Sequence, residues 1–385
     1  MLGLYAESIF AKPIKMKFVF CCYFLLLAAV VTAQPVSNIE NIFIITTDGL
    51  RWQEVFNGAD SELISNPRYV EDTSLLKQLY GDSTSELRRQ KLMPFLWNIV
   101  AQQGQLYGNR LYENKVDVSN FYKISYPGYN EMFTGYPDPV FIPNIPIYNR
   151  NSNIFEYLNA KKEYAGKVAA FSSWNIFSAM LNKRRTHLPV NSGYENLPDD
   201  SSFNNEIINI SQDLIIHKKN TRYDLLTYLS AREYIEHHQP KVVLIGFGET
   251  DEFAHGKRYD LYLQQAANVD KMIAELWYYV QTSSFYRNKT AFIITTDHGR
   301  GEKPGTWYKH GMLTKGSGEA WFAVIGPGIS GEGEIKSNQQ NYQKQMASTI
   351  ASLLGEKFNS GKNNADPIFF PMTTGYNMAV LRQPK

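Results

Sequence analysis

The sequence has almost no cysteine, no strong net charge and a single long apolar run. Its two cysteines, Cys21 and Cys22, stand side by side near the N-terminus of a 385-residue chain. The balance of 39 basic against 37 acidic residues gives a net charge of +2, so no strong field favours nucleic acid or an anionic membrane. A hydrophobic content of 43% and a charged content of 20% exclude a disordered chain. The sequence shows no internal repeat and no basic block longer than Lys183-Arg184-Arg185.

The long apolar run has the surroundings of an export signal. Three lysines precede Phe18–Val31, and the small residue Ala33 follows it. A charged region, a short apolar core and a small exit residue are typical of a secretory signal peptide. The run is shorter than the ~18–20 residues that a membrane-spanning helix needs, and a retained N-terminal anchor is the alternative. We predict a signal peptide over residues 1–33, with Met16 as an alternative start, and a periplasmic or secreted protein.

Removal of this segment would change the chemistry open to residues 34–385. Both cysteines would be lost, and 36 basic residues would face 36 acidic ones. Disulfides and thiolate ligands are then excluded, so a metal site has to be built from His, Asp and Glu. A chain of this length can bury its own core. We therefore predict one catalytic domain over residues 34–385, with no transmembrane anchor after signal cleavage and no nucleic-acid-binding surface.

Short apolar runs alternate with helical patterns along this domain. The runs are Ile42–Thr46, Val242–Gly246 and Ala291–Thr295, and their unbroken apolar character is typical of parallel strands covered on both faces. Helical spacing of apolar residues occurs over residues 92–103, 222–236, 259–280 and 345–354. This alternation predicts an α/β fold: a doubly wound, mostly parallel sheet with helices on both faces. The polar residues 53–90 and 183–220 are predicted to be cap insertions.

Each predicted strand is followed by acidic residues, and two of the three also by a histidine. Asp48 follows the first strand, Asp251 and His255 follow the second, and Asp297 and His298 follow the third. Ligands of open α/β sheets lie beyond the carboxyl ends of the strands, so we expect these side chains to face a common site. The spacing of four between Asp251 and His255 would place both on one face of a helical turn.

A third histidine, His310, completes a set of six residues of metal-ligand type. Mixed imidazole and carboxylate ligands favour zinc over calcium or magnesium. Two groups of three protein ligands would leave the open positions that catalytic zinc requires. Taken singly, Asp48 is typical of a turn residue. Asp251 and His255 alone are typical of a pair on the surface of a helix. The prediction of a metal site depends on their combination at strand ends.

Ser125 is the candidate nucleophile. It precedes Tyr126-Pro127-Gly128, a bend that could expose its hydroxyl at the start of a helix, where backbone N–H groups favour an anion. The ordinary alternative is a serine at a helix N-terminus.

The order of these residues resembles the alkaline phosphatase superfamily, and most closely its type I phosphodiesterase/nucleotide pyrophosphatase branch. The resemblance runs from about residue 41 to 355 and includes the segments 322–329 and 346–355. It implies hydrolysis of a small-molecule phosphate ester through a phosphoryl-serine intermediate on Ser125. It also implies two zinc ions, one held by Asp251, His255 and His310, the other by Asp48, Asp297, His298 and the Ser125 oxygen.

Departures from the family pattern limit the choice of substrate. Phosphodiesterase relatives carry Asn-His where this chain has Gly128-Tyr129, and sulfatases carry an Arg after the bend that is missing here. The cations of a monoesterase are missing from residues 172–175, although Arg51 or the basic residues 183–185 could substitute. Asn144 is the candidate for contact with a phosphoryl oxygen. Diesters are therefore slightly favoured over monoesters.

Four alternatives stay open. Two are enzymes of the same superfamily: a serine-type sulfatase and a phosphomutase-like member. The third is an exported binding protein that kept the fold and lost its chemistry. An aromatic content of 14% suggests the fourth, a protein that handles glycans or lipids.

Overall fold

The computed structural model describes residues 39–198 and 202–373, which belong to one compact unit. The predicted signal peptide, residues 1–33, lies outside the described residues. Within the described ranges, every helix is too short or too polar to cross a membrane.

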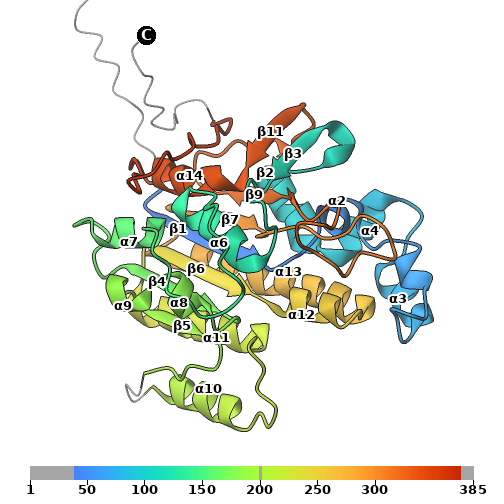
Figure 1. The fold of residues 1–385 in the computed structure, drawn as a ribbon, viewed down its shortest axis with the longest axis horizontal. Coiled ribbons are helices and arrows are strands. Elements are labelled where there is room, and N and C mark those ends of the chain that lie inside the picture. Colours follow the sequence, from blue (N-terminus) through green and yellow to red (C-terminus); the bar gives the residue numbers. More distant parts are fainter. Residues whose placement is uncertain (1–38, 199–201, 374–385) are drawn as a thin grey trace, which may run out of the picture. The chain divides into compact units, whose positions relative to one another are not determined.

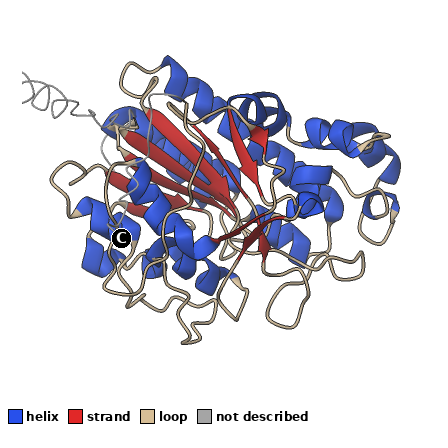
Figure 2. Ribbon diagram, turned by 90° about the horizontal axis from the view of Figure 1, so that it is seen from above, coloured by secondary structure: helices blue, strands red, loops and turns tan. Residues whose placement is uncertain are grey.

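An eight-stranded sheet forms the centre of this unit, in the order β10-β2-β9-β7-β1-β6-β4-β5 (Figure 2). Its strands in chain order are β1 (Asn41–Thr47), β2 (Gly104–Tyr107), β4 (Val168–Ser172), β5 (Val190–Ser192), β6 (Val242–Phe247), β7 (Thr290–Thr295), β9 (Phe322–Ile325) and β10 (Gly333–Glu334). A second sheet contains β3 (Asn114–Asp117), β8 (Glu319–Ala320) and β11 (Gln339–Tyr342).

The three strands predicted from the sequence are β1, β6 and β7, and they lie side by side at the centre of the sheet. β1 pairs in parallel with both neighbours, so that Ile44 lies opposite Leu244 on one side and Ile293 on the other. β4 and β5 continue the parallel arrangement, whereas β9 runs antiparallel to β7 and β2. The prediction of a mostly parallel sheet is confirmed.

Helices cover both faces of the sheet (Figure 1). The α-helices are α2 (Trp52–Asn57), α3 (Thr73–Tyr80), α4 (Ser85–Leu92), α5 (Ala101–Gln103), α6 (Ser125–Thr134), α7 (Ile154–Asn159), α8 (Phe177–Met180), α9 (Lys183–Thr186), α10 (Phe203–Asp213), α11 (Asp224–His238), α12 (Glu249–His255), α13 (Tyr259–Thr282) and α14 (Met346–Leu353). Shorter turns are η1 (Leu63–Ser65), the π-helical η2 (Leu96–Val100), η3 (Arg110–Tyr112) and η4 (Gln343–Gln345).

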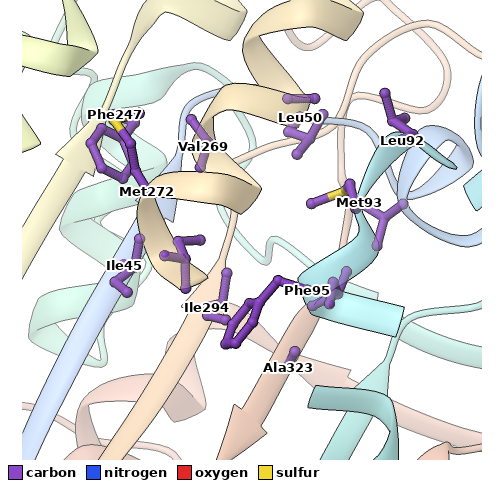
Figure 3. Close-up of a cluster of buried hydrophobic side chains, with 14 of the residues drawn as sticks. Ile45, Leu50, Leu92, Met93, Phe95, Phe247, Val269, Met272, Ile294 and Ala323 are labelled. Carbon is purple, nitrogen blue, oxygen red and sulfur yellow. The ribbon is translucent and has the colours of Figure 1, made fainter. Parts of the chain in front are cut away.

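Alternate side chains of the central strands enter two separate cores. On β1, Phe43 and Ile45 join the core beneath α2, α4, α11 and α13, whereas Ile42 and Ile44 join the core beneath α6, α7, α8 and α14. Figure 3 shows part of the first core, where Met272 of α13 lies beside Phe247. Strands buried on both faces need apolar residues at every position, which explains their unbroken apolar runs.

The helix predicted over residues 92–103 is interrupted. α4 ends at Leu92, and after Met93 a new helical segment begins at Pro94, which has no N–H to continue the preceding helix. The carboxylate of Asp270 on α13 accepts the backbone N–H groups of Phe95 and Leu96, at 2.8 and 2.9 Å. A capping group 175 residues away along the chain is invisible to local periodicity.

The predicted cap insertion over residues 183–220 is in part a strand of the sheet. β5 lies within this range and pairs in parallel with β4 at one sheet edge. The range 53–90 contains α3 and most of α2 and α4, and buried apolar residues of α2 and α3 join the first core. A capping role for the remainder stays a prediction.

Candidate active site

Asp48, Asp297 and His298 meet at the carboxyl ends of β1 and β7, and we call them the inner group. Their ligand-type atoms all lie within 4.8 Å of one another, and all three side chains are buried. Because β1 and β7 are parallel neighbours, the residues that follow both strands emerge at the same sheet edge.

Hydrogen bonds orient the inner group and leave two lone-pair atoms facing its centre. The Gly49 N–H donates to Oδ1 of Asp297 at 3.0 Å, while Oδ2 of Asp297 is buried and accepts no hydrogen bond. The Nδ1 atom of His298 lies 3.0 Å from the Gly299 carbonyl, so it carries the ring proton and leaves Nε2 unprotonated. This Nε2 lies 3.4 Å from Oδ2 of Asp297. A buried oxygen without a donor beside an imidazole lone pair fits a bound cation.

Asp251, His255 and His310 form a second set, the outer group, whose ligand atoms also lie within 4.8 Å. α12 places Asp251 and His255 one turn apart, with His255 Nε2 at 3.0 Å from Asp251 Oδ2. The Nε2 atoms of His255 and His310 are 3.1 Å apart. Two nitrogens on one tetrahedral zinc, with bonds of about 2.0–2.1 Å, would lie about 3.3 Å apart. The spacing therefore fits two imidazoles on one metal ion.

The two groups adjoin one another through their histidines. The rings of His298 and His310 stack with centroids 4.1 Å apart and planes 11° from parallel. One inner and one outer ligand thus lie in contact, so metal ions in the two groups would be neighbours.

Burial raises the pKa values of the two inner carboxylates and lowers the pKa values of His298 and His310. Burial, together with the charge of Asp297, raises the pKa of Asp48 to about 7. Burial raises the pKa of Asp297 to about 7 as well. Burial lowers the pKa of His298, and burial with nearby positive charge lowers the pKa of His310 well below its usual value. The imidazoles of His298 and His310 are therefore neutral and ready to ligate, and the carboxylates of Asp48 and Asp297 need a cation in order to ionise easily.

Ser125, the candidate nucleophile, is the first residue of α6 and is buried beside the inner group. Its Oγ lies 3.2 Å from Nε2 of His298 and 3.4 Å from Oδ1 of Asp48. A Cβ atom on Gly128 would come within 2.6 Å of the Asp297 carbonyl oxygen. Only glycine allows this close approach of α6 to the end of β7, which gives a structural reason for the Gly128-Tyr129 departure.

Asn144 lies beside the nucleophile turn. Its Oδ1 accepts the backbone N–H of Tyr126 at 2.9 Å, although the residue is otherwise exposed. This hydrogen bond holds the side-chain amide of Asn144 against the backbone of Tyr126, the residue that follows Ser125. A contact between that amide and a phosphoryl oxygen stays a prediction.

Arg51, predicted as a possible substrate contact, lies in the core and is paired with a carboxylate. Its guanidinium is buried, with 1% of the residue exposed, and its Nε donates to Glu54 at 2.8 Å. A second guanidinium nitrogen donates to the Gly301 carbonyl at 2.9 Å. A charge in such a place needs a carboxylate partner, which leaves the side chain no freedom to meet a substrate.

The other basic residues considered for this role are also occupied. Lys183 donates to Glu195 at 2.9 Å, and Arg185 donates to Glu156 at 2.8 Å. Arg184 lies over the ring of Tyr148, 4.3 Å from its centroid.

Arg300 is a site residue that the sequence analysis missed. Its buried guanidinium contacts Asp251 of the outer group and donates to the carbonyls of Gly49 and Tyr308, at 3.0 and 2.9 Å. It thus joins the loops that follow β1 and β7 to α12, which carries Asp251. Its position directly after Asp297-His298-Gly299 is the feature of the sequence that could have indicated a role in the site.

Comparisons with known proteins bear on the fold. No protein-family model and no curated protein matches the sequence. Among solved structures, alkaline phosphatase PafA aligns with a TM-score of 0.56 at 12% identity, covering 87% of this chain and 99% of that one. The lipoteichoic acid synthase LtaP from Listeria monocytogenes aligns with a TM-score of 0.53 at 12% identity, covering 86% and 74%. BT1596, a 2-O GAG sulfatase, gives 0.52 at 12% identity, covering 85% and 73%.

The chain shares the fold of these structures, among them alkaline phosphatase PafA. The superfamily resemblance that the sequence motifs indicated is therefore supported at the level of the fold, and the prediction of an alkaline phosphatase-like α/β architecture is confirmed. At 12% identity, a shared fold does not indicate which substrate this chain acts on. The phosphodiesterase branch stays a prediction.

Proposed function

We propose that this chain is an exported hydrolase that cleaves phosphate esters, using two zinc ions and a phosphoryl-serine intermediate on Ser125. One observation carries the proposal: two three-residue groups of metal-ligand type adjoin each other, and one hydroxyl oxygen lies 3.2 Å from a ligand nitrogen of the inner group. The alkaline phosphatase-like fold supports the same reading.

The inner group with Ser125 would hold one zinc ion, and the outer group would hold the other. Zinc, when bound, supplies Lewis acidity: it lowers the pKa of the serine hydroxyl, whose proton passes to solvent, and it offsets negative charge on the phosphate. Asp48 and Asp297 would be ionised in that state. The Gly299 carbonyl keeps the His298 proton on Nδ1, so that Nε2 stays available as a ligand.

The covalent steps belong to Ser125. Its Oγ forms a bond to phosphorus while the bond from phosphorus to the leaving alcohol oxygen breaks, and the phosphoryl group stays on the serine. A water oxygen then forms a bond to phosphorus, the bond to Oγ breaks, and the serine is regenerated. The side-chain amide of Asn144, whose Oδ1 accepts the Tyr126 N–H, would donate to a phosphoryl oxygen.

Diesters are the proposed substrates because a monoester needs more positive charge. A monoester dianion carries one more negative charge than a diester. Of the cations considered for that charge, Arg51, Lys183 and Arg185 are paired with carboxylates elsewhere, and Arg184 lies over the ring of Tyr148. Of the substrate contacts predicted from the sequence, this leaves the neutral amide of Asn144, which suits a monoanion.

The export part of the proposal depends on the sequence of residues 1–33 alone. A charged segment, a 14-residue apolar run and a small exit residue support cleavage after Ala33. Residues 34–385 would then act as one periplasmic or secreted catalytic domain.

The test is turnover of matched aryl esters by the purified protein. A diester, a monoester and a sulfate ester of 4-nitrophenol would be assayed with zinc and after chelation. We expect zinc-dependent turnover with the diester fastest, and a phosphoryl adduct on Ser125 detectable by mass spectrometry. Absence of zinc-dependent phosphoesterase activity would contradict the proposal. Fast turnover of the sulfate ester by a protein with modified Ser125 would favour the sulfatase alternative.

A further inference from the structure

Three segments that contact the neighbours of Ser125, or contain them, carry exposed apolar side chains. We call these side chains the apolar rim: Phe121, Phe141, Ile145, Ile147, Met312 and Leu313. Leu313 is 94% exposed. Large apolar groups in water gain free energy when a ligand covers them, and clusters of them mark binding surfaces.

Contacts join the first two segments of the rim to each other and to α6. The Tyr122 hydroxyl donates to the Pro139 carbonyl at 2.5 Å, and the rings of Tyr122 and Phe141 lie with centroids 4.8 Å apart. The Tyr126 hydroxyl, on the first turn of α6, donates to the Ile147 carbonyl at 2.6 Å. The rim therefore borders the helix turn that carries Ser125.

The third segment leaves directly from the outer group. Met312 and Leu313 follow His310 by two and three residues. Nδ1 of His310 lies 3.4 Å from the Lys123 carbonyl, and a Cβ on Gly311 would lie 3.9 Å from the Ile124 side chain. The segment thus starts in contact with the residues that precede Ser125. Three chain segments present apolar groups at the border of one site.

We propose that the phosphoester substrate carries an apolar organic group, which lies against the apolar rim while its phosphate meets Ser125. This inference rests on the proposed function and adds the chemical class of the substrate. The phosphate end of such a molecule is charged and the organic group is not, which matches a buried polar site bordered by exposed apolar side chains. The apolar group can belong to a dissolved ester or to a lipid in an aggregate.

A second exposed apolar stripe provides a matched control. Phe203, Ile207, Ile210 and Leu214 follow helical spacing along and just beyond α10, and Leu214 is 75% exposed. α10 lies at the bottom of Figure 1, whereas α6 lies over the central strands. The stripe is as apolar as the rim but borders neither ligand group, so substitutions there change exposed apolar area without touching the site.

The experiment compares alkyl 4-nitrophenyl phosphates that share one leaving group and differ in chain length. Methyl, butyl and octyl esters would be assayed with the zinc-loaded full chain, below and above the concentration at which the octyl ester aggregates. We expect KM to fall about tenfold from methyl to octyl below that concentration, with little change in kcat. Leu313→Ser and Phe141→Ser should remove this gain, while Leu214→Ser and Phe203→Ser should retain it.

The outcomes separate this inference from the proposed function. Turnover of the methyl ester with a KM that does not depend on chain length would overturn the proposed contact with the apolar rim and leave the proposed phosphoesterase activity standing. No turnover of any ester would overturn both. An octyl gain that is confined to aggregates and lost in Leu313→Ser supports the apolar contact and assigns it to a lipid surface. If Leu214→Ser abolished the fall in KM with chain length as fully as Leu313→Ser, the proposed role of the apolar rim would be overturned, because the effect would not depend on side chains near the site.

Discussion

The inner and outer groups contain similar ligand types but lie in different environments. His298 of the inner group has a fully buried side chain, whereas the side chain of His255 in the outer group is 53% exposed. The inner residues follow β1 and β7 directly, whereas the outer ones lie on α12 and on the loop that contains His310. One group is therefore part of the protein core, and the other opens to solvent.

Under the proposed mechanism, this difference gives the two groups different tasks. A buried, hydrogen-bonded ligand set is preorganised and holds its ion and the nucleophile in a fixed geometry. The exposed ligand of the outer group, His255, gives water and the leaving alcohol a way in. We therefore expect the inner group to bind zinc more tightly and to tolerate substitution less well.

The largest effect is expected for Ser125→Ala, which removes the nucleophile shared with the inner group. Turnover should fall by a factor of about 10³ or more, while both zinc ions stay bound because six ligands remain. Steady-state kinetics with metal analysis of the same sample measures both. Ser352→Ala is the control, since it changes another buried helical serine, on α14. Retention of more than a tenth of the activity in Ser125→Ala would refute a nucleophilic role.

A pair of histidine substitutions tests the asymmetry itself. His298→Ala should lose one zinc equivalent and its activity, and excess zinc should not restore either. His255→Ala should weaken zinc binding by about 10–100-fold and recover activity in excess zinc, because water can take the vacant position of an open site. Zinc titrations followed by activity distinguish the two variants. Equal rescue of both would remove the distinction between inner and outer groups.

The buried carboxylates make the stability of the metal-free protein depend on pH. Burial raises the pKa of Asp297 to about 7 in the folded state, against about 3.9 in an unfolded chain. A raised pKa contributes stability at low pH that is lost as the pH rises through about 7. The metal-free protein should therefore lose stability from pH 5 to 8, and Asp297→Asn should lose less.

Zinc should reverse this trend, because it favours the ionised carboxylates. The melting temperature of chelated and zinc-loaded protein at pH 5, 6, 7 and 8 measures the effect, with a difference of a few degrees expected per kcal/mol. Asp213→Asn, at the exposed end of α10, serves as the charge-matched control. A zinc-induced shift that does not grow with pH would argue against ionisation of the inner carboxylates on metal binding.

Much of this arrangement could be predicted from local sequence, and the failures have a common physical origin. Apolar runs identify β1, β6 and β7, and the rule that parallel strands end at one edge brings Asp48 and Asp297 together. The role of Arg51 could not be judged, because pairing with Glu54 in the core shows only in three dimensions. Arg300 was missed since its partner at Gly49 lies 251 residues away. Long-range hydrogen bonds leave no local periodicity.

The smallest effect is expected for Arg185→Ala, which lies outside both groups. Its guanidinium pairs with Glu156 on a partly exposed surface, and such pairs contribute about 0–1 kcal/mol. We expect kcat/KM for the diester to change by less than about twofold. A large loss of activity without loss of stability would reinstate Arg185 as a substrate contact and weaken the argument for diesters.

Anomalous diffraction at the zinc absorption edge, from crystals grown with zinc, tests the central claim most directly. The account predicts two neighbouring peaks, one among Asp48, Asp297 and His298 with the Ser125 oxygen beside it, the other among Asp251, His255 and His310. A single peak remote from these residues, or a serine oxygen turned away from both ions, would contradict it.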